Sequence, residues 1–324
     1  MPSRHDVAII QDVAEPDADR RGVGGVGGGG ASRPVLKRIE AVVNAASGSV
    51  GPDGAERLSA MLERFGPDAH VANAQPADIE AAVKAAVAAK PDLLIVLAGD
   101  GTAGLAARLC GPDGPLVAPL PGGTMNMLPH ALYGRVSWPE ALEATLSSGV
   151  VRPVSGGEVD GRTFYVAAIL GAPALWAKAR EALRHGKLRQ AWLRAQHALR
   201  QAFAGRLRYA LEDGPRSKTE ALTLMCPLVS RACDDDTALE AAALNVHHAG
   251  EAFRLGFNML TGDWRRDPSV TVQRCCHGRA WAKGHMPAIL DGEPVRLNRV
   301  AEIRFRPVAF RALAPPASGS TAGE

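Results

Sequence analysis

The pattern of apolar and polar residues divides the chain into two parts. Up to about residue 150, uninterrupted apolar runs alternate with segments in which apolar residues recur every three to four positions. The clearest run is LLIVL at 93–97, which stops abruptly at AGDGT, 98–102. A short apolar run that ends in glycines is typical of a strand buried on both faces of a parallel sheet.

In the first part, strands and helices are expected to alternate. The expected strands are 38–43, 70–73, 93–97 and 115–120. The expected helices are 54–65, 76–90, 103–109, 127–132 and 139–147. This alternation predicts a parallel sheet with helices on both faces, an α/β domain over 34–150. Residues 1–33, rich in Gly, Asp, Arg and Pro, are expected to be a disordered tail.

From residue 151 the pattern changes to short apolar runs, which predict a mostly antiparallel domain, a β-sandwich over 151–313. Residues 314–324 are expected to form a second disordered tail. The runs lie at 151–154, 163–170, 207–211, 221–228, 244–247, 270–273, 288–290 and 303–305.

One long basic segment, 173–203, interrupts these runs and is expected to be a helical insertion. It carries Trp176 and Trp192 among many Arg, Lys and Leu residues, with Glu181 as its one acid. A basic amphipathic helix with tryptophans can lie on an anionic membrane surface. A helix with a solvated basic face and its apolar side in the core explains the same pattern, so both interpretations stay open.

Bulk composition limits the classes of function. The length of 324 residues favours two domains, and 46% hydrophobic with 22% charged residues is ordinary for a soluble globular protein. A formal net charge of +3 is too small to indicate a nucleic-acid partner. Five cysteines without a C-x-x-C pair favour reduced cytosolic thiols over disulfides or a zinc site. Without a long apolar run or an apolar leader, neither a membrane span nor secretion is expected.

Glycines and small polar residues follow three of the predicted strands. Asn44 and Ser47 follow the first, the segment 99–104 follows the strand at 93–97, and PGGTMN at 121–126 follows the next one. Ligands of parallel α/β sheets bind at the carboxyl ends of the strands, and glycines before a helix can hold a phosphate. A phosphate-binding edge is therefore expected, although tight turns and simple capping explain each segment taken singly.

Gly99, Gly101 and Gly104 also form the dinucleotide pattern G-x-G-x-x-G. The ribose-binding acid expected ~20 residues later is missing, and no Walker A sequence follows these glycines. Asp100, inside the glycines, would repel phosphates unless Mg²⁺ bridges them or backbone N–H groups bind the carboxylate. This favours a site for metal-assisted phosphoryl transfer.

Two acids far along the chain, Asp291 and Glu293, flank Gly292 after an apolar run. Phosphoryl transfer needs a base at the acceptor hydroxyl, and these carboxylates are candidates for it. An ordinary β-turn explains the Asp-Gly pair as well.

Taken in order, AGDGT at 98–102, PGGTMN at 121–126 and DGE at 291–293 resemble the signatures of the diacylglycerol kinase catalytic-domain family. That family includes bacterial lipid kinases and sphingosine kinases, and the resemblance spans about residues 38–313. It implies an α/β nucleotide-binding domain like that of NAD kinases and phosphofructokinases, followed by a β-sandwich lipid-binding domain.

The same resemblance implies an activity and a set of site residues. ATP, with Mg²⁺, would donate its γ-phosphate to a lipid hydroxyl, most simply that of diacylglycerol, as in phospholipid biosynthesis. The enzyme would be cytoplasmic and peripherally membrane-associated, touching the membrane through 173–203. Glu293 would be the general base, with Asp291 beside it. The implied nucleotide-binding residues are Asn44, Asn73, Gly99, Asp100, Gly101, Thr102, Gly104, Gly122, Gly123, Thr124 and Asn126.

The chain departs from the family pattern at several positions. Ala98 replaces the first glycine of G-G-D-G-T, and Met127 stands where Asp is frequent. Ala241 and Ala242, preceded by Glu240, stand where some bacterial members carry the D-G of a structural Mg²⁺ site. The metal ligands therefore stay unknown. An NAD kinase-like soluble kinase and a catalytically silent nucleotide- or lipid-binding protein remain alternatives. The acceptor lipid and the oligomeric state, with a homodimer among the options, stay open.

Overall fold

The computed structural model describes residues 34–66, 68–171, 207–230, 236–245, 265 and 267–316. The expected tails, apart from residues 314–316, and the expected insertion at 173–203 lie outside these residues. In the part that is described, no helix is long and apolar enough to span a membrane.

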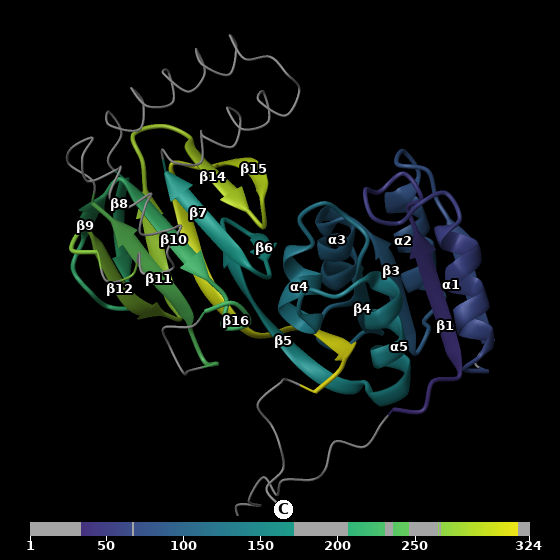
Figure 1. The fold of residues 1–324 in the computed structure, drawn as a ribbon. Coiled ribbons are helices and arrows are strands. Elements are labelled where there is room, and N and C mark those ends of the chain that lie inside the picture. Colours follow the sequence, from purple (N-terminus) through teal and green to yellow (C-terminus); the bar gives the residue numbers. More distant parts are fainter. Residues whose placement is uncertain are drawn as a thin grey trace, which may run out of the picture. The chain divides into compact units, whose positions relative to one another are not determined.

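The first part of the described chain is a parallel sheet with helices between its strands (Figure 1). The strands are hydrogen-bonded in the order β2-β1-β3-β4. Their bounds are β1 Arg38–Val43, β2 Asp68–Asn73, β3 Leu93–Ala98 and β4 Leu116–Pro121. The helices are α1 Gly54–Glu63, α2 Ile79–Ala88, α3 Asp100–Cys110, α4 Met127–Tyr133 and α5 Trp138–Ser148.

Helices cover both faces of this sheet, as the sequence predicts. Every residue of β3 and β4 is buried, which is why these strands are continuous apolar runs. Alternate residues of the strands face opposite sides. Val42 and Val96 pack with α2, α3 and α4, whereas Ile39 and Ile95 pack with α1 and α5.

The second part is antiparallel, and its longest strand joins it to the first. Strand β16, Val300–Ala314, pairs in parallel with β4 at Ala312 and antiparallel with β5 and β13. The first sheet therefore continues as β4-β16-β13-β8-β9, and β5 pairs with β16 on one side and with β6 on the other. The other strands of this sheet are β5 Val150–Val159, β6 Arg162–Phe164, β8 Leu207–Leu211, β9 Ser217–Thr219 and β13 His277–Trp281.

A second sheet has the order β12-β11-β10-β7-β14-β15. Tyr209 and Ile303 of the first sheet share one core with Leu222, Leu224 and Met286 of the second. This shared core confirms a two-sheet arrangement for the second part. The strands are β7 Ala167–Gly171, β10 Ala221–Met225, β11 Leu239–Leu244, β12 Val270–Cys275, β14 Met286–Leu290 and β15 Glu293–Leu297.

Three details differ from the sequence-based expectations. The strand expected at 244–247 is β11, which ends at Leu244, and three of its six buried residues are alanines. Strands β13 and β15, in which charged or polar residues interrupt the apolar ones, were not expected. Strand β16 continues to the buried Ala314, one residue past the expected end of the domain.

Candidate functional site

The segments that follow β1, β3 and β4 meet at one edge of the parallel sheet. Asn44 donates its N–H to the Leu97 carbonyl at 3.0 Å. Ser49 donates its N–H to the Gly122 carbonyl at 3.0 Å and its hydroxyl to the Gly123 carbonyl at 2.9 Å. Backbone hydrogen bonds thus tie together three segments that are far apart in the sequence, at the strand ends where ligands of such sheets bind.

Gly122 and Gly123 allow two of these segments to touch. A Cβ at Gly122 would lie 2.8 Å from the Ala98 nitrogen, and one at Gly123 would lie 2.7 Å from the Gly99 Cα. Contacts this short do not occur, so a side chain at either position would separate the segments. These two glycines are therefore needed for packing, whatever ligand the edge holds.

Gly99 and Gly101 have a different environment at the start of α3. Gly99 is the N-cap, with extended backbone, and the helix begins at Asp100 rather than at Ala103 as the sequence predicted. Within the described residues, the N–H groups of Asp100 and Gly101 have no hydrogen-bond acceptor. A Cβ at Gly101 would meet nothing within 4 Å. The start of this 11-residue helix thus presents free N–H groups beside open space, as an anion site requires.

The Asp100 carboxylate points toward the start of α4. It accepts the N–H of Leu128 at 3.3 Å. Burial raises the pKa of Asp100 above the usual aspartate range, and N–H groups of Leu128, Met127 and Asn126 oppose that rise. The sequence left two explanations for Asp100 among these glycines, a bridging Mg²⁺ or hydrogen bonds from backbone N–H groups. The structure shows the hydrogen bonds.

Asn126 shapes the segment after β4. Its backbone is left-handed, with φ of 51°, a conformation that Asn adopts more readily than most residues. Its side-chain oxygen accepts the Gly123 N–H at 2.7 Å, and its amide nitrogen donates to the Gly123 carbonyl at 2.9 Å. The side chain is buried and bound to its own segment, which makes Asn126 a positioning residue of this loop.

Asp291 anchors the turn between β14 and β15. Its carboxylate accepts the N–H groups of Tyr165 at 2.7 Å, Val166 at 2.8 Å and Ala167 at 3.0 Å. Burial raises the pKa of Asp291, these three hydrogen bonds oppose the rise, and the charge of Asp100 adds to it. The two aspartates are therefore near enough to interact electrostatically.

The turn itself reaches the start of α4. Asp291 and Gly292 have φ of 46° and 88°, so both are left-handed. A Cβ at Gly292 would lie 3.8 Å from the Met127 sulfur. The third sequence signature thus lies beside the residue that follows the second one. Glu293, the first residue of β15, is exposed and has no side-chain partner within the described residues.

The remaining predicted residues lie around the same edge. Asn73 is the last residue of β2, is exposed and pairs with Val43. Thr102 and Gly104 lie within α3, and Thr124 is exposed next to Gly48, where a Cβ would lie 3.2 Å from the Thr124 hydroxyl oxygen.

Sequence reasoning missed Tyr165. A Cβ at Gly104 would lie 3.8 Å from the Tyr165 ring, and Tyr165 also binds Asp291 through its N–H. Its ring packs edge-on against Phe310, with centroids 5.3 Å apart. Tyr165 therefore links α3 to the Asp291 turn. In the sequence it is one residue of an apolar run, with nothing to single it out.

In the part of the chain described here, no group of three or more His, Cys, Asp or Glu side chains is arranged so that it could hold a metal ion. Glu240, which precedes the altered family segment, is fully buried and pairs with Arg265 at 2.5 Å. It also accepts the Ser230 hydroxyl. A guanidinium therefore neutralises this carboxylate.

The fold is of the α/β class, with glycine-rich segments at the carboxyl ends of its parallel strands, and comparison with known proteins narrows this class. Residues 38–159 match the family model of the diacylglycerol kinase catalytic domain. The resemblance seen in the sequence is thereby confirmed for this segment. None of the curated proteins matches the sequence.

Solved structures extend the similarity over most of the chain. A crystal structure of a diacylglycerol kinase from Bacillus anthracis strain Sterne is 15% identical, with a TM-score of 0.62. A candidate diacylglycerol kinase from the same strain is 18% identical, with a TM-score of 0.67. Each comparison covers 88% of this chain and 99% of the other. At these identities the likeness shows a shared fold.

Proposed function

We propose that the protein is an ATP-dependent lipid kinase that phosphorylates a lipid hydroxyl, most simply that of diacylglycerol. The observation that carries the proposal is the meeting of three separated segments at one sheet edge, 44–49, 98–104 and 121–127, joined there by the Asp291 turn. The match of residues 38–159 to the diacylglycerol kinase catalytic domain supports the same activity.

The start of α3 fits the phosphates of a nucleotide. The N–H groups of Asp100 and Gly101 are free among the described residues, and the space next to Gly101 is open. Free N–H groups at a helix N-terminus bind anions, and the helix dipole adds to the attraction. In this proposal, Gly99, Gly101, Thr102 and Gly104 hold the phosphates, while Gly122, Gly123 and Asn126 hold the two segments in register.

Bound ATP, accompanied by Mg²⁺, supplies the phosphoryl group and much of the charge neutralisation that its transfer needs. The chain offers Asp100 as the acidic group nearest the free N–H groups in sequence, but the backbone of α4 already binds that carboxylate. We therefore assign the magnesium to the nucleotide rather than to a cage of protein ligands.

Glu293 is the proposed general base for the acceptor hydroxyl. Three backbone N–H groups bind the Asp291 carboxylate, so it is poorly placed to take a proton. Glu293 lies two residues further on, exposed and without a partner in the described part. Asp291 then acts as a positioning residue that fixes the turn, and Glu293 receives the proton.

The decisive measurement is transfer of labelled γ-phosphate from ATP to a panel of lipids in mixed micelles, with NAD as a further acceptor. We expect Glu293→Gln to lower kcat by at least ~10²-fold, the lower range for a positioned base. Glu143→Gln, which neutralises an exposed glutamate of α5, should leave the rate unchanged.

A second variant tests the nucleotide site without turnover. Gly101→Ala should keep or raise stability, because Ala is favoured over Gly in a helix by up to ~1 kcal/mol and meets no neighbour here. It should weaken ATP binding about tenfold or more, because the new methyl group enters the space assigned to phosphate. Phosphorylation of NAD alone would establish a soluble kinase, and ATP binding without any turnover would establish a binding protein. Either result overturns the proposal.

A further inference from the structure

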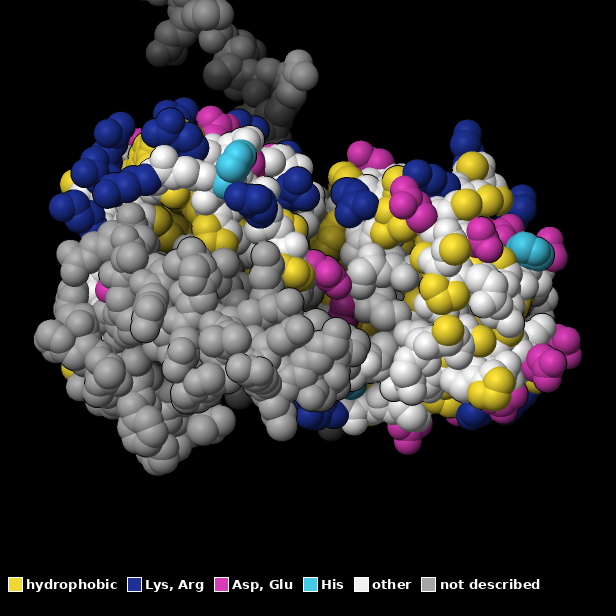
Figure 2. Space-filling model, turned by 90° about the horizontal axis from the view of Figure 1, so that it is seen from above, with side chains coloured by type: hydrophobic (Ala, Val, Ile, Leu, Met, Phe, Trp, Pro, Cys, Tyr) yellow, Lys and Arg dark blue, Asp and Glu magenta, His cyan; other side chains and the backbone are white. Residues whose placement is uncertain are grey.

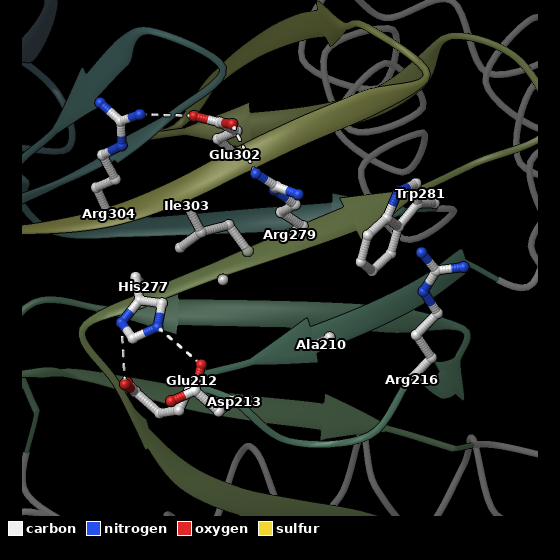
Figure 3. Close-up of a pocket in the computed structure, with 11 residues that line it drawn as sticks. Ala210, Glu212, Asp213, Arg216, His277, Arg279, Trp281, Glu302, Ile303 and Arg304 are labelled. Carbon is white, nitrogen blue, oxygen red and sulfur yellow. Dashed lines mark hydrogen bonds and ion pairs between the residues drawn. The ribbon is translucent and has the colours of Figure 1, made fainter.

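The outer face of the antiparallel strands β8, β9, β13 and β16 lies outside the site described above. A shallow cavity of about 420 Å³ opens on it, and Figure 3 shows the residues that line it. Cross-strand pairing sets the residues of this face in rows, and Trp281, which lines the cavity, belongs to one of them. One row is Val300, Trp281, Arg208 and Lys218, on β16, β13, β8 and β9.

The two ends of this face differ in charge. At one end, His277 lies 3.1 Å from Glu212, and Glu302 lies between Arg279 at 3.4 Å and Arg304 at 2.7 Å (Figure 3). Acidic groups partner the basic ones there, so this end is close to neutral.

The other end, which we name the tryptophan patch, consists of Arg208, Arg216, Lys218, Trp281, Lys283, Arg299 and Val300. Its five basic side chains are exposed, and within the described residues none of them forms an ion pair. The acid at its border, Asp160, binds the N–H and side chain of Asn298. Figure 2 shows Lys and Arg side chains gathered along this half of the molecule, which carries the antiparallel strands.

Aromatic and aliphatic groups lie among these charges. Trp281 is half-buried, and its ring stacks under the Arg216 guanidinium at 4.7 Å (Figure 3). Val300, its cross-strand neighbour, is 47% exposed. Tryptophan prefers the interface between lipid and water, where its ring meets acyl chains and its N–H meets headgroups. Arginine and lysine around it attract anionic headgroups.

We propose that the tryptophan patch is a surface on which the protein docks to bilayers that contain anionic phospholipids. Five exposed basic groups that form no ion pair with any described residue lie together at one end of a sheet face, and they complement the negative potential of such a bilayer. Docking through this patch would bring the protein to the bilayer that contains the lipid substrate proposed above, and none of the described helices can span a membrane. The proposal concerns docking alone and does not depend on the kinase activity.

The same features fit a membrane better than a nucleic acid. Stacking on a base needs an open aromatic face, and Arg216 covers one face of the Trp281 ring. The exposed valine next to the tryptophan can bury its apolar side chain against lipid acyl chains. The phosphate backbone of a nucleic acid provides no apolar surface for it. The formal charge of the whole chain, +3, is also small for a protein that binds nucleic acid.

The test is co-sedimentation of the full chain, without ATP, with vesicles of phosphatidylglycerol and phosphatidylcholine or of phosphatidylcholine alone. We expect binding to the anionic vesicles at 0.1 M salt and loss of most of it at 0.5 M, because salt screens exposed charges. The triple variant Arg208→Gln, Arg216→Gln, Lys218→Gln should lower the partition coefficient at least about tenfold.

A matched control separates the patch from net charge. Arg64→Gln, Lys84→Gln, Lys90→Gln removes the same charge from exposed positions in the first part of the chain and should lower binding less than twofold. Equal binding by wild type and the patch variant, or equal losses in both triple variants, overturns the proposal. So does equal binding to both kinds of vesicle. Binding of a single-stranded oligonucleotide is measured in parallel. If the patch variant loses binding to the oligonucleotide but not to the anionic vesicles, the proposal is overturned in favour of a nucleic-acid partner.

Discussion

At the residue scale, the site rests on two aspartates that the backbone binds in different ways. Asp100 accepts N–H groups at the start of α4, and Asp291 accepts three N–H groups at the start of β7. Burial nevertheless raises the pKa of both, so the desolvation of each charge exceeds what these hydrogen bonds return. In their ionised form, these two carboxylates therefore lower the stability of the folded protein. Groups with pKa values shifted in this way are common at functional sites.

The raised pKa of Asp100 predicts how the stability of the protein depends on pH. An acid whose pKa is raised in the folded protein binds more protons there than in the unfolded chain, so stability falls as the pH rises through the range from ~3.9 to the raised value. Asp100→Asn removes this loss and keeps an oxygen that can accept the Leu128 N–H. We therefore expect the free energy of unfolding of the variant, relative to wild type, to increase as the pH rises from about 3.5 to about 7.

Urea unfolding at a series of pH values measures this difference. Asp113→Asn, in the turn after α3, serves as the control, because this aspartate is exposed and has no side-chain partner within the described residues, so its difference from wild type should stay flat. A difference for Asp100→Asn that stays flat or falls with pH would contradict the assignment.

At the element scale, β11 shows how an internal ion pair holds a strand. All six residues of this strand are buried, and Glu240 is among them. The Arg265 guanidinium reaches Glu240 at 2.5 Å and 3.3 Å, and the Ser230 hydroxyl binds the same carboxylate. A buried carboxylate needs such partners because an isolated charge in the interior is very costly.

Arg265→Met should therefore destabilise the protein strongly, by about 3–5 kcal/mol, because it leaves the Glu240 charge buried without its cation. The double variant with Glu240→Met should recover most of this loss, because well-packed apolar groups can replace a buried ion pair. Chemical unfolding of the two variants and wild type gives the comparison. If the single and double variants lose equal stability, charge burial is not the cause.

At the scale of the whole molecule, β16 connects every described hydrophobic core of substantial size. Ala301 and Ile303 lie in the core between the two sheets. Phe310 and Ala312 lie in the core under α2, α3 and α4, and Leu313 lies in the core under α1 and α5. Strand β16 thus contributes side chains to cores that the sequence assigned to two different domains. We therefore expect the parallel and the antiparallel parts of the chain to unfold together.

Phe310→Ala tests this expectation. Phe310 is fully buried against Tyr165, and truncation of a buried Phe costs about 3–5 kcal/mol. We expect far-UV circular dichroism and tryptophan fluorescence to report one urea transition, shifted equally in both signals. Phe305→Ala, on the same strand but half-buried against the other core, should shift the same transition by less. Two separate transitions would show that the parts unfold independently.

The parallel part of the fold was predicted well because its signal is local. Runs such as 93–97 are apolar throughout, since both faces of β3 are covered, and the helices between them are periodic over whole turns. The antiparallel part was predicted less accurately. Half of the residues of strand β11 are alanines, whose burial reflects available space rather than strand propensity, and β13 and β15 have one face in solvent.

The sequence by itself determined the order of the elements in the parallel part, the class of sheet and the residues that lie at the carboxyl ends of its strands. These follow from local properties: apolar periodicity, glycine content and the types of polar group at strand ends. Only the tertiary structure showed that Gly122 and Gly123 serve close packing, that Asn126 and Asp291 bind backbone, and that Tyr165 joins two segments. Those roles depend on which backbone atoms lie opposite a side chain, and chain folding brings these atoms together from positions far apart in the sequence.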